Sequence, residues 1–278
     1  MRRLALGALL ASLAVPAAAE RSADGRLRWE EGDAAVTVAK RGGFSTRGQR
    51  VPLPPLEKGA RRRVVFAPSG GLFAVIDQAT DAVSLHGDSP RGTRAAQTLV
   101  TGALMRMMDA RGRVLWTKRL PETYAVGSVS IAAPVVLGAD GTSALLMEDA
   151  DPYTKAKPLV LVMDPKGREI LRLDYAAWSR VDELLLSADG KWLALRGIGR
   201  IPEADTWGSA LGHYGLADGG RMVKPSGAAI GGRTLRSFDA QGRVCCLLER
   251  RDLAVYDHDG LRTVVTPKEA DELFGPAP

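Results

Sequence analysis

The chain has 278 residues, of which 45% are hydrophobic and 25% charged, and its formal net charge is +6. This length allows one sizeable repeat domain or two small ones. A charge of this size bears on solubility and on weak attraction to anionic surfaces, and it does not indicate a dedicated nucleic-acid site.

The N-terminus has the order of a secretory signal peptide. Met1-Arg2-Arg3 precedes an apolar run from Leu4 to Val15, and small residues then lead to Ala19. The run is roughly a dozen residues long, which is shorter than the ~20 of a membrane helix, and no later segment comes closer. We therefore expect cleavage after Ala19, export to a periplasm or beyond, and no membrane span.

Two kinds of short glycine turn alternate along the rest of the chain. The first kind lies at Gly71, Gly141, Gly190 and Gly242, and the second at Gly112, Gly167, Gly220 and Gly260. The segments between the turns are rich in Leu, Val and Ile, as short buried strands are. Asp-Gly pairs such as Asp189-Gly190 are strong hairpin signals, because glycine accepts a positive φ.

Equivalent turns are roughly 50 residues apart, which is the size of a β-propeller blade. The sequence thus predicts an all-β fold, a β-propeller of four to five four-stranded blades with a short C-terminal helix. Four blades are expected at 62–120, 130–175, 180–226 and 233–267. A hairpin within 26–39 either completes a partial fifth blade or pairs with the last blade to close the ring.

The predicted organisation has four parts: a signal peptide at 1–19, a hairpin and basic Pro/Gly-rich linker at 20–61, propeller repeats at 62–267 and a tail at 268–278. Basic residues crowd the segment from Lys40 to Arg63, where Glu57 is the single acid. A solvated linker is the favoured interpretation. The alternative is weak contact with an anionic surface through Arg61, Arg62 and Arg63.

Two short motifs resemble those of known propellers. Ser187-Ala188-Asp189-Gly190-Lys191 followed by Trp192 resembles the inner hairpin of bacterial WD40-like and TolB-like propellers. Met108-Asp109-Ala110-Arg111-Gly112 continuing to Trp116 resembles the outer strands of quinoprotein-like propellers. The resemblance implies architecture and says little about activity, since propellers host binding, scaffolding and catalysis.

No catalytic residue, metal ligand or cofactor is predicted. The histidines His86, His213 and His258 fall at different places in their repeats, so a shared site is not expected. Glu148, Asp149 and Asp151 leave calcium binding as an alternative to the favoured interpretation, which is solvated carboxylates. Cys245 and Cys246 are adjacent in an expected strand and so point to opposite faces, which argues against an intrachain disulfide.

The expected binding surface is the side of the disc opposite the short turns. Connections at 77–99, 149–157 and 197–209, with inter-blade links at 121–130, 174–180 and 224–232, gather there and form what we call the long-loop face. Trp178 and Trp207 either pack locally or contact a ligand. The predicted binding residues are Trp178, Arg180, Trp207, Arg200, Tyr153, Arg91 and Arg94.

The favoured function is an exported binding module for a protein or cell-envelope component. The alternative is a propeller-type hydrolase or lyase with a cation in its central channel, so whether the chain is an enzyme stays open. A partial quinoprotein-like domain would need a channel wide enough for a flat cofactor. The sequence does not determine the oligomeric state.

Overall fold

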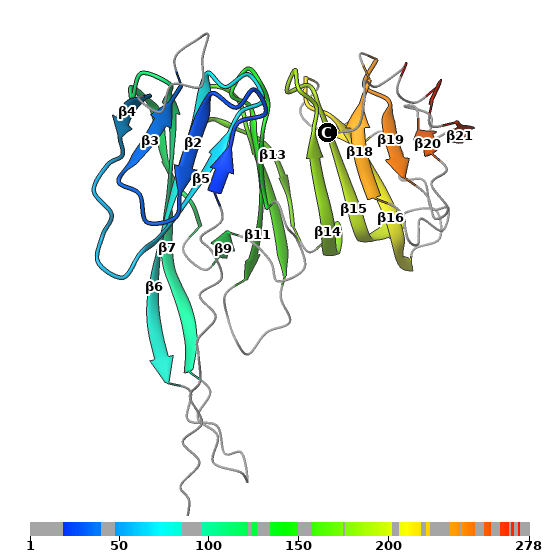
Figure 1. The fold of residues 1–278 in the computed structure, drawn as a ribbon. Coiled ribbons are helices and arrows are strands. Elements are labelled where there is room, and N and C mark those ends of the chain that lie inside the picture. The colour runs from blue at the N-terminus through cyan, green and yellow to red at the C-terminus, as the bar shows by residue number, and fades with distance from the viewer. Residues whose placement is uncertain are drawn as a thin grey trace, which may run out of the picture.

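The fold was taken from a computed structural model, which describes residues 19–39, 48–84, 96–121, 124–126, 134–149, 157–174, 176–201, 206–217, 221–222, 234–239, 241–247, 253–256, 262–266, 268–269 and 272. These are the described residues. Their regular structure is almost entirely strand, and the strands form five antiparallel sheets (Figure 1). We number the sheets blades 1 to 5 in chain order.

Each blade is built from four strands that are consecutive in the chain. Blade 1 contains β1 (Ala19–Arg21), β2 (Leu27–Glu30), β3 (Ala35–Val38) and β4 (Gln49–Pro52). Blade 2 contains β5 (Arg61–Phe66), β6 (Leu72–Ser84), β7 (Ala96–Asp109) and β8 (Val114–Arg119). Blade 3 contains β10 (Val135–Leu137), β11 (Ser143–Asp149), β12 (Pro158–Met163) and β13 (Glu169–Leu173), and β9 (Tyr124–Val126) pairs with the far end of β11.

Blade 4 contains β14 (Trp178–Leu186), β15 (Trp192–Ile201), β16 (Thr206–Gly215) and β17 (Arg221–Met222). Blade 5 contains β18 (Thr234–Phe238), β19 (Val244–Leu247), β20 (Leu253–Tyr256) and β21 (Arg262–Val265). Sheets of four consecutive antiparallel strands, set side by side around an arc, are the architecture of a β-propeller. The predicted fold class is confirmed.

The glycine turns occupy equivalent places, as the repeat spacing predicted. Gly141, Gly190 and Gly242 join the first and second strands of blades 3, 4 and 5, and each has a positive φ. In blade 2 the residue with positive φ at this turn is Gly70 rather than its neighbour Gly71. Gly112 and Gly167 join the third and fourth strands of their blades, whereas Gly220 and Gly260 lie outside the described residues.

Blade 1 is a complete four-stranded blade and brings the number of described blades to five. Its first turn has the same hydrogen-bond pattern as the first turn of blade 4. Ser22 Oγ donates to Asp24 and accepts the amide N–H of Leu27. Ser187 Oγ donates in the same way to Asp189 and accepts the N–H of Trp192. Ser22-Ala23-Asp24-Gly25 repeats Ser187-Ala188-Asp189-Gly190, so this turn was visible in the sequence.

A second turn motif, Asp-x-x-Gly-Arg, occurs three times. The carboxylates of Asp109, Asp164 and Asp239 each accept two backbone N–H bonds and pair with the Arg four residues later. Partial burial by itself would raise the pKa of Asp164. The hydrogen bonds from Arg168 and Lys166 outweigh this and lower the pKa.

Apolar clusters lie between successive blades. Leu27 and Val36 of blade 1 meet Phe73 and Val75 of blade 2. Three further clusters join blade 2 to 3, blade 3 to 4 and blade 4 to 5. The blades therefore stabilise one another by apolar burial across their faces.

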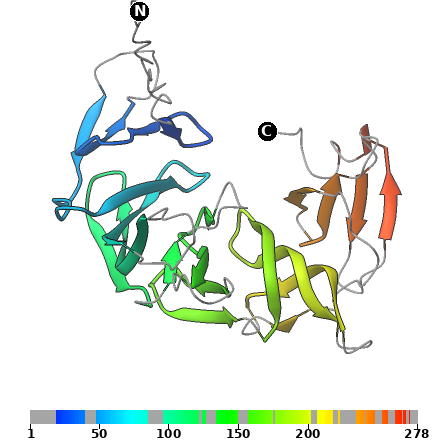
Figure 2. The ribbon, with the colours of Figure 1, turned by 90° about the horizontal axis from the view of Figure 1, so that it is seen from below.

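The arc of blades is open between blade 1 and blade 5 (Figure 2). The hairpin at 26–39 belongs to blade 1 and pairs with no strand of blade 5 among the described residues. This decides between the two alternatives for that segment. The segment from Lys40 to Arg63, expected as a linker, also contributes β4 and the beginning of β5.

Two expected loops are largely strand, and the expected helix is short. Residues 77–84 and 96–99 continue β6 and β7, while 197–201 and 206–209 continue β15 and β16. The alternation of apolar and polar residues alone could not show where these hairpins extend beyond the apolar core. In the tail, residues 268, 269 and 272 are helical, and Thr266 and Glu269 form a reciprocal capping box that lowers the pKa of Glu269.

Candidate functional site

The long-loop face is built by the ends of two extended hairpins. In Figure 1 the β6–β7 hairpin of blade 2 and strands β14, β15 and β16 of blade 4 extend toward the lower end of the molecule. The short turns of these blades lie at the opposite end. The side of the propeller predicted to carry long connections is therefore distinguished by long paired strands.

On blade 4 this end displays an Arg–Trp pair. Arg200 of β15 and Trp207 of β16 are direct cross-strand partners, and the side chains of such partners lie next to each other on one face of the sheet. Trp207 is 43% exposed. Arg180 of β14 pairs with Ile198, two residues from Arg200, and its side chain is 55% exposed while it forms an ion pair with Asp182. Arg180, Arg200 and Trp207 are thus brought to one end of one blade.

Trp178 has a different position from these three residues. Its side chain is only 1% exposed, and Nε1 donates a 2.8 Å hydrogen bond to the hydroxyl of Tyr214. Gly199 and Gly212 leave room for the ring, since a Cβ at Gly212 would lie 2.5 Å from Trp178 Cζ2. Trp178 therefore packs locally in the cluster between blades 3 and 4.

The same burial acts on Tyr214. Loss of hydration disfavours the phenolate and raises the pKa of Tyr214 to about 12, although the hydrogen bond from Trp178 opposes the shift. A pocket of about 200 Å³ lies beside this pair and is lined by Ala176, Ala177, Gly199, Arg200 and Ala210 as well. Arg200 thus links the pocket to the exposed end of the blade.

Several predicted residues cannot be placed. Tyr153, Arg91 and Arg94 lie outside the described residues, as do His86, His258 and Asp151. His213 lies within β16, and its buried ring lies 5.4 Å from that of Trp192 and 5.8 Å from that of Phe238. Within the described ranges, no three His, Cys, Asp or Glu side chains converge as a metal site.

The two cysteines occupy different environments. Cys246 belongs to the cluster between blades 4 and 5, whereas Cys245 packs with Leu253 and Val265. This agrees with the expectation that adjacent residues of β19 point to opposite faces.

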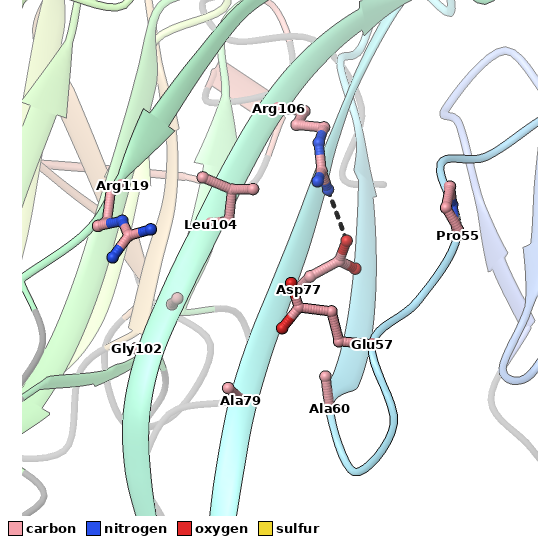
Figure 3. Close-up of a pocket in the computed structure, with 10 residues that line it drawn as sticks. Pro55, Glu57, Ala60, Asp77, Ala79, Gly102, Leu104, Arg106 and Arg119 are labelled. Atoms are coloured by element: carbon pink, nitrogen blue, oxygen red, sulfur yellow. Dashed lines mark hydrogen bonds and ion pairs between the residues drawn. The ribbon is translucent and has the colours of Figure 1, made fainter.

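A second candidate site, which the sequence had not indicated as a unit, lies on blade 2. Figure 3 shows a pocket between β6, β7 and the segment at 53–60 that precedes β5. Its volume is about 320 Å³. Its walls carry both charged side chains and small or apolar residues, namely Pro55, Glu57, Ala60, Asp77, Ala79, Gly102, Ala103, Leu104, Arg106 and Arg119.

Two arginines converge on one carboxylate in this pocket. Arg62 binds Asp77 through Nε at 2.6 Å and Nη2 at 2.7 Å, and Arg106 Nη1 lies 2.6 Å from Asp77 Oδ2. The side chains of Arg62, Asp77 and Arg106 are 6%, 12% and 19% exposed. Arg62 is therefore an internal residue, and a surface contact would use Arg61 and Arg63, which are exposed.

A sequence signal for this cluster did exist. Arg62 stands two residues before the buried Val64, and Asp77 stands two residues after the buried Val75. On neighbouring strands, charged residues can occupy the positions where the alternation would place apolar side chains. They then indicate that this part of the sheet face is no longer covered by another sheet. The sequence could not show that these strands would pair in this register.

Comparisons with known proteins find similarity to solved structures alone. No family model matches the sequence, and no curated protein matches it. Among solved structures, a eukaryotic initiation factor has 11% identity, a TM-score of 0.44 and coverage of 94% of this chain and 65% of its own. The propeller domain of the Trilobed protease from Pyrococcus furiosus has 11% identity, a TM-score of 0.46 and coverage of 76% and 58%.

A protein described as TolB from Agrobacterium tumefaciens has 15% identity, a TM-score of 0.40 and coverage of 89% of this chain and 79% of its own. The chain thus spans less than two thirds of the length of the initiation factor and of the protease propeller domain. Similarity at this level carries no activity, substrate or partner to this chain. Which propeller superfamily includes the chain stays a prediction.

None of the helices in the described part of the chain has the length and apolarity to cross a membrane.

Proposed function

We propose that this chain is an exported binding module that captures a protein or cell-envelope partner on its long-loop face. The main supporting observation is the Arg200–Trp207 pair, which lies at the end of a hairpin, where Trp207 is 43% exposed. Tryptophan and arginine are the side chains that most often dominate binding energy at protein interfaces. The nearby Arg180 adds a second exposed guanidinium on the same blade.

The rigid support of this end also favours binding. Trp178 and Tyr214 link β14 to β16 by a buried hydrogen bond within the same blade. An anchor on a pre-organised strand loses less conformational freedom on binding than one on a loose loop.

A capture experiment tests this function. Wild-type protein, the double variant Trp207→Ala with Arg180→Ala, and the control Lys191→Ala are immobilised and exposed to a cell-envelope extract. Lys191 is an exposed, ion-paired residue in the short turn at the other end of blade 4, so it controls for loss of a surface charge. We expect the double variant to bind its partner at least tenfold more weakly, since truncation of a true anchor costs about 2 kcal/mol or more of binding free energy.

Retention of every partner by the folded double variant would refute the choice of this surface. Loss of capture in Lys191→Ala alone would place the interface on the turn side instead. Export is tested separately by cell fractionation and N-terminal sequencing, with Glu20 expected as the first residue of the mature protein.

A propeller-type hydrolase or lyase with a central cation is the competing function. It predicts turnover that a chelator abolishes. Partner capture that persists in chelator, without turnover of the captured molecule, favours the binding module.

A further inference from the structure

The pocket on blade 2 exists because blade 1 is short. Strands β2 and β3 have four residues each, whereas β6 has 13 and β7 has 14. Blade 1 therefore covers only part of the blade 2 face turned toward it. In the covered part Phe73 and Val75 are fully buried. Arg106 is the cross-strand partner of Val75, and the next pair along the same face is Asp77 with Leu104.

The buried charges of this region do not balance, whereas the two exposed charged side chains that line the pocket, Glu57 and Arg119, have opposite signs. Arg62, Asp77 and Arg106 together carry one net positive charge, and all three side chains are largely withdrawn from water. Asp77 already uses both carboxylate oxygens on Arg62. Within the part of the chain that the structure describes, Nη1 is the single Arg106 nitrogen in a hydrogen bond or ion pair, and it too binds Asp77. A poorly hydrated excess charge favours an incoming group of opposite sign.

The shape around Arg106 favours more than a small ion. The pocket of about 320 Å³ adjoins a second one of about 300 Å³, and both are bordered by Pro55 and Ala60. The second pocket is lined by the apolar residues Trp29, Leu53 and Leu56 and also by the charged residues Glu31, Asp33, Arg61 and Arg62. A compartment that contains Arg106, continued by one that contains Trp29 and Leu53, suits an extended peptide with an acidic and an apolar side chain.

We propose that this groove binds an acidic peptide segment of the protein partner, with a carboxylate side chain accepting hydrogen bonds from Arg106. The proposal rests on the proposed function, because it names a recognition element of the same partner. A planar guanidinium that offers two parallel N–H donors matches a carboxylate in geometry as well as in charge. Gly102 also lines the pocket, and a Cβ added there would meet no atom within 4 Å.

Glu57 opposes this binding. It lines the same pocket from the 53–60 segment (Figure 3), and its negative charge repels an incoming carboxylate. Removal of the Glu57 charge and removal of the Arg106 charge therefore have opposite effects on affinity. A general loss of folding would not produce that pair of effects.

The test measures fluorescence anisotropy of a labelled Gly-Glu-Leu-Glu-Gly peptide with the full-length mature protein at low salt. We expect Arg106→Gln to weaken binding at least tenfold and Glu57→Gln to tighten it about threefold. The control Arg113→Gln removes an exposed guanidinium from the β7–β8 turn and is expected to leave affinity unchanged. If Arg106→Gln does not fold, the peptide affinity of Glu57→Gln still tests the proposal.

Several outcomes overturn the proposal. They are equal binding of the matched Gly-Gln-Leu-Gln-Gly peptide, equal affinity of Arg106→Gln and wild type, or no gain in Glu57→Gln. Competition by free glutarate or inorganic phosphate as effective as the peptide would show an adventitious anion only. If Arg106→Gln loses the peptide but the extract captures no protein, the groove stands and the proposed function fails.

Discussion

Tyr214→Phe isolates the buried hydrogen bond that holds β14 to β16. The substitution keeps the ring and removes the hydroxyl that accepts the N–H of Trp178 at 2.8 Å. Both side chains are buried, so the indole N–H is left without an acceptor in the core. An unsatisfied buried donor costs about 1–3 kcal/mol. For a chain of this size, that cost lowers Tm by roughly 2–12 °C.

Stability measured over a series of pH values provides an independent test of this burial. Because burial raises the pKa of Tyr214 from 10.0 to about 12, the protonated phenol is favoured in the folded state. This stabilisation is fully present below pH 10 and is lost as pH rises through about 12. The shift corresponds to about 3 kcal/mol. The advantage of wild type over Tyr214→Phe should therefore shrink between those pH values.

Urea unfolding, followed by tryptophan fluorescence, measures both effects. Tyr124→Phe is the control, because Tyr124 is only half-buried and its variant should differ from wild type by no more than about 0.5 kcal/mol. Equal stability of Tyr214→Phe and wild type at neutral pH would refute the hydrogen-bond argument. A stability difference that does not change toward pH 12 would refute the argument from burial.

Three further predictions concern turns and cysteines. Asp164→Asn should destabilise the protein by about 1–2 kcal/mol. Because the pKa of Asp164 is lowered in the folded state, wild type should lose this stability advantage as pH falls below 3.8 and through the folded-state pKa. An advantage that stays constant in acid denaturation would contradict this prediction. Gly242→Ala should cost about 1–3 kcal/mol in chemical denaturation, because the new Cβ would lie 2.2 Å from Trp192 Cε2 at a φ of 78°; an unchanged midpoint would count against this packing. Alkylation of the unfolded, unreduced protein should label both Cys245 and Cys246, and labelling of neither in a pure monomer would indicate a bond between them.

The sequence by itself determined the repeat and the class of fold. Each glycine turn is a local event, since Asp189-Gly190 or Asp164 with Gly167 closes a hairpin from hydrogen bonds within a few residues. Strand alternation is equally local, and so Cys245 and Cys246 were expected on opposite faces before any packing was known. The first turn of blade 1 was also readable, because Ser22 to Gly25 repeats Ser187 to Gly190.

Only the tertiary structure decided which faces are covered. Trp178 is internal because Gly199 and Gly212 on neighbouring strands make room for its ring, and the sequence does not state that register. Arg62, Asp77 and Arg106 meet because three strands align them beyond the edge of a shorter blade. Burial depends on the length and position of the neighbouring sheet, whereas a periodic pattern records only which side of its own strand a residue occupies.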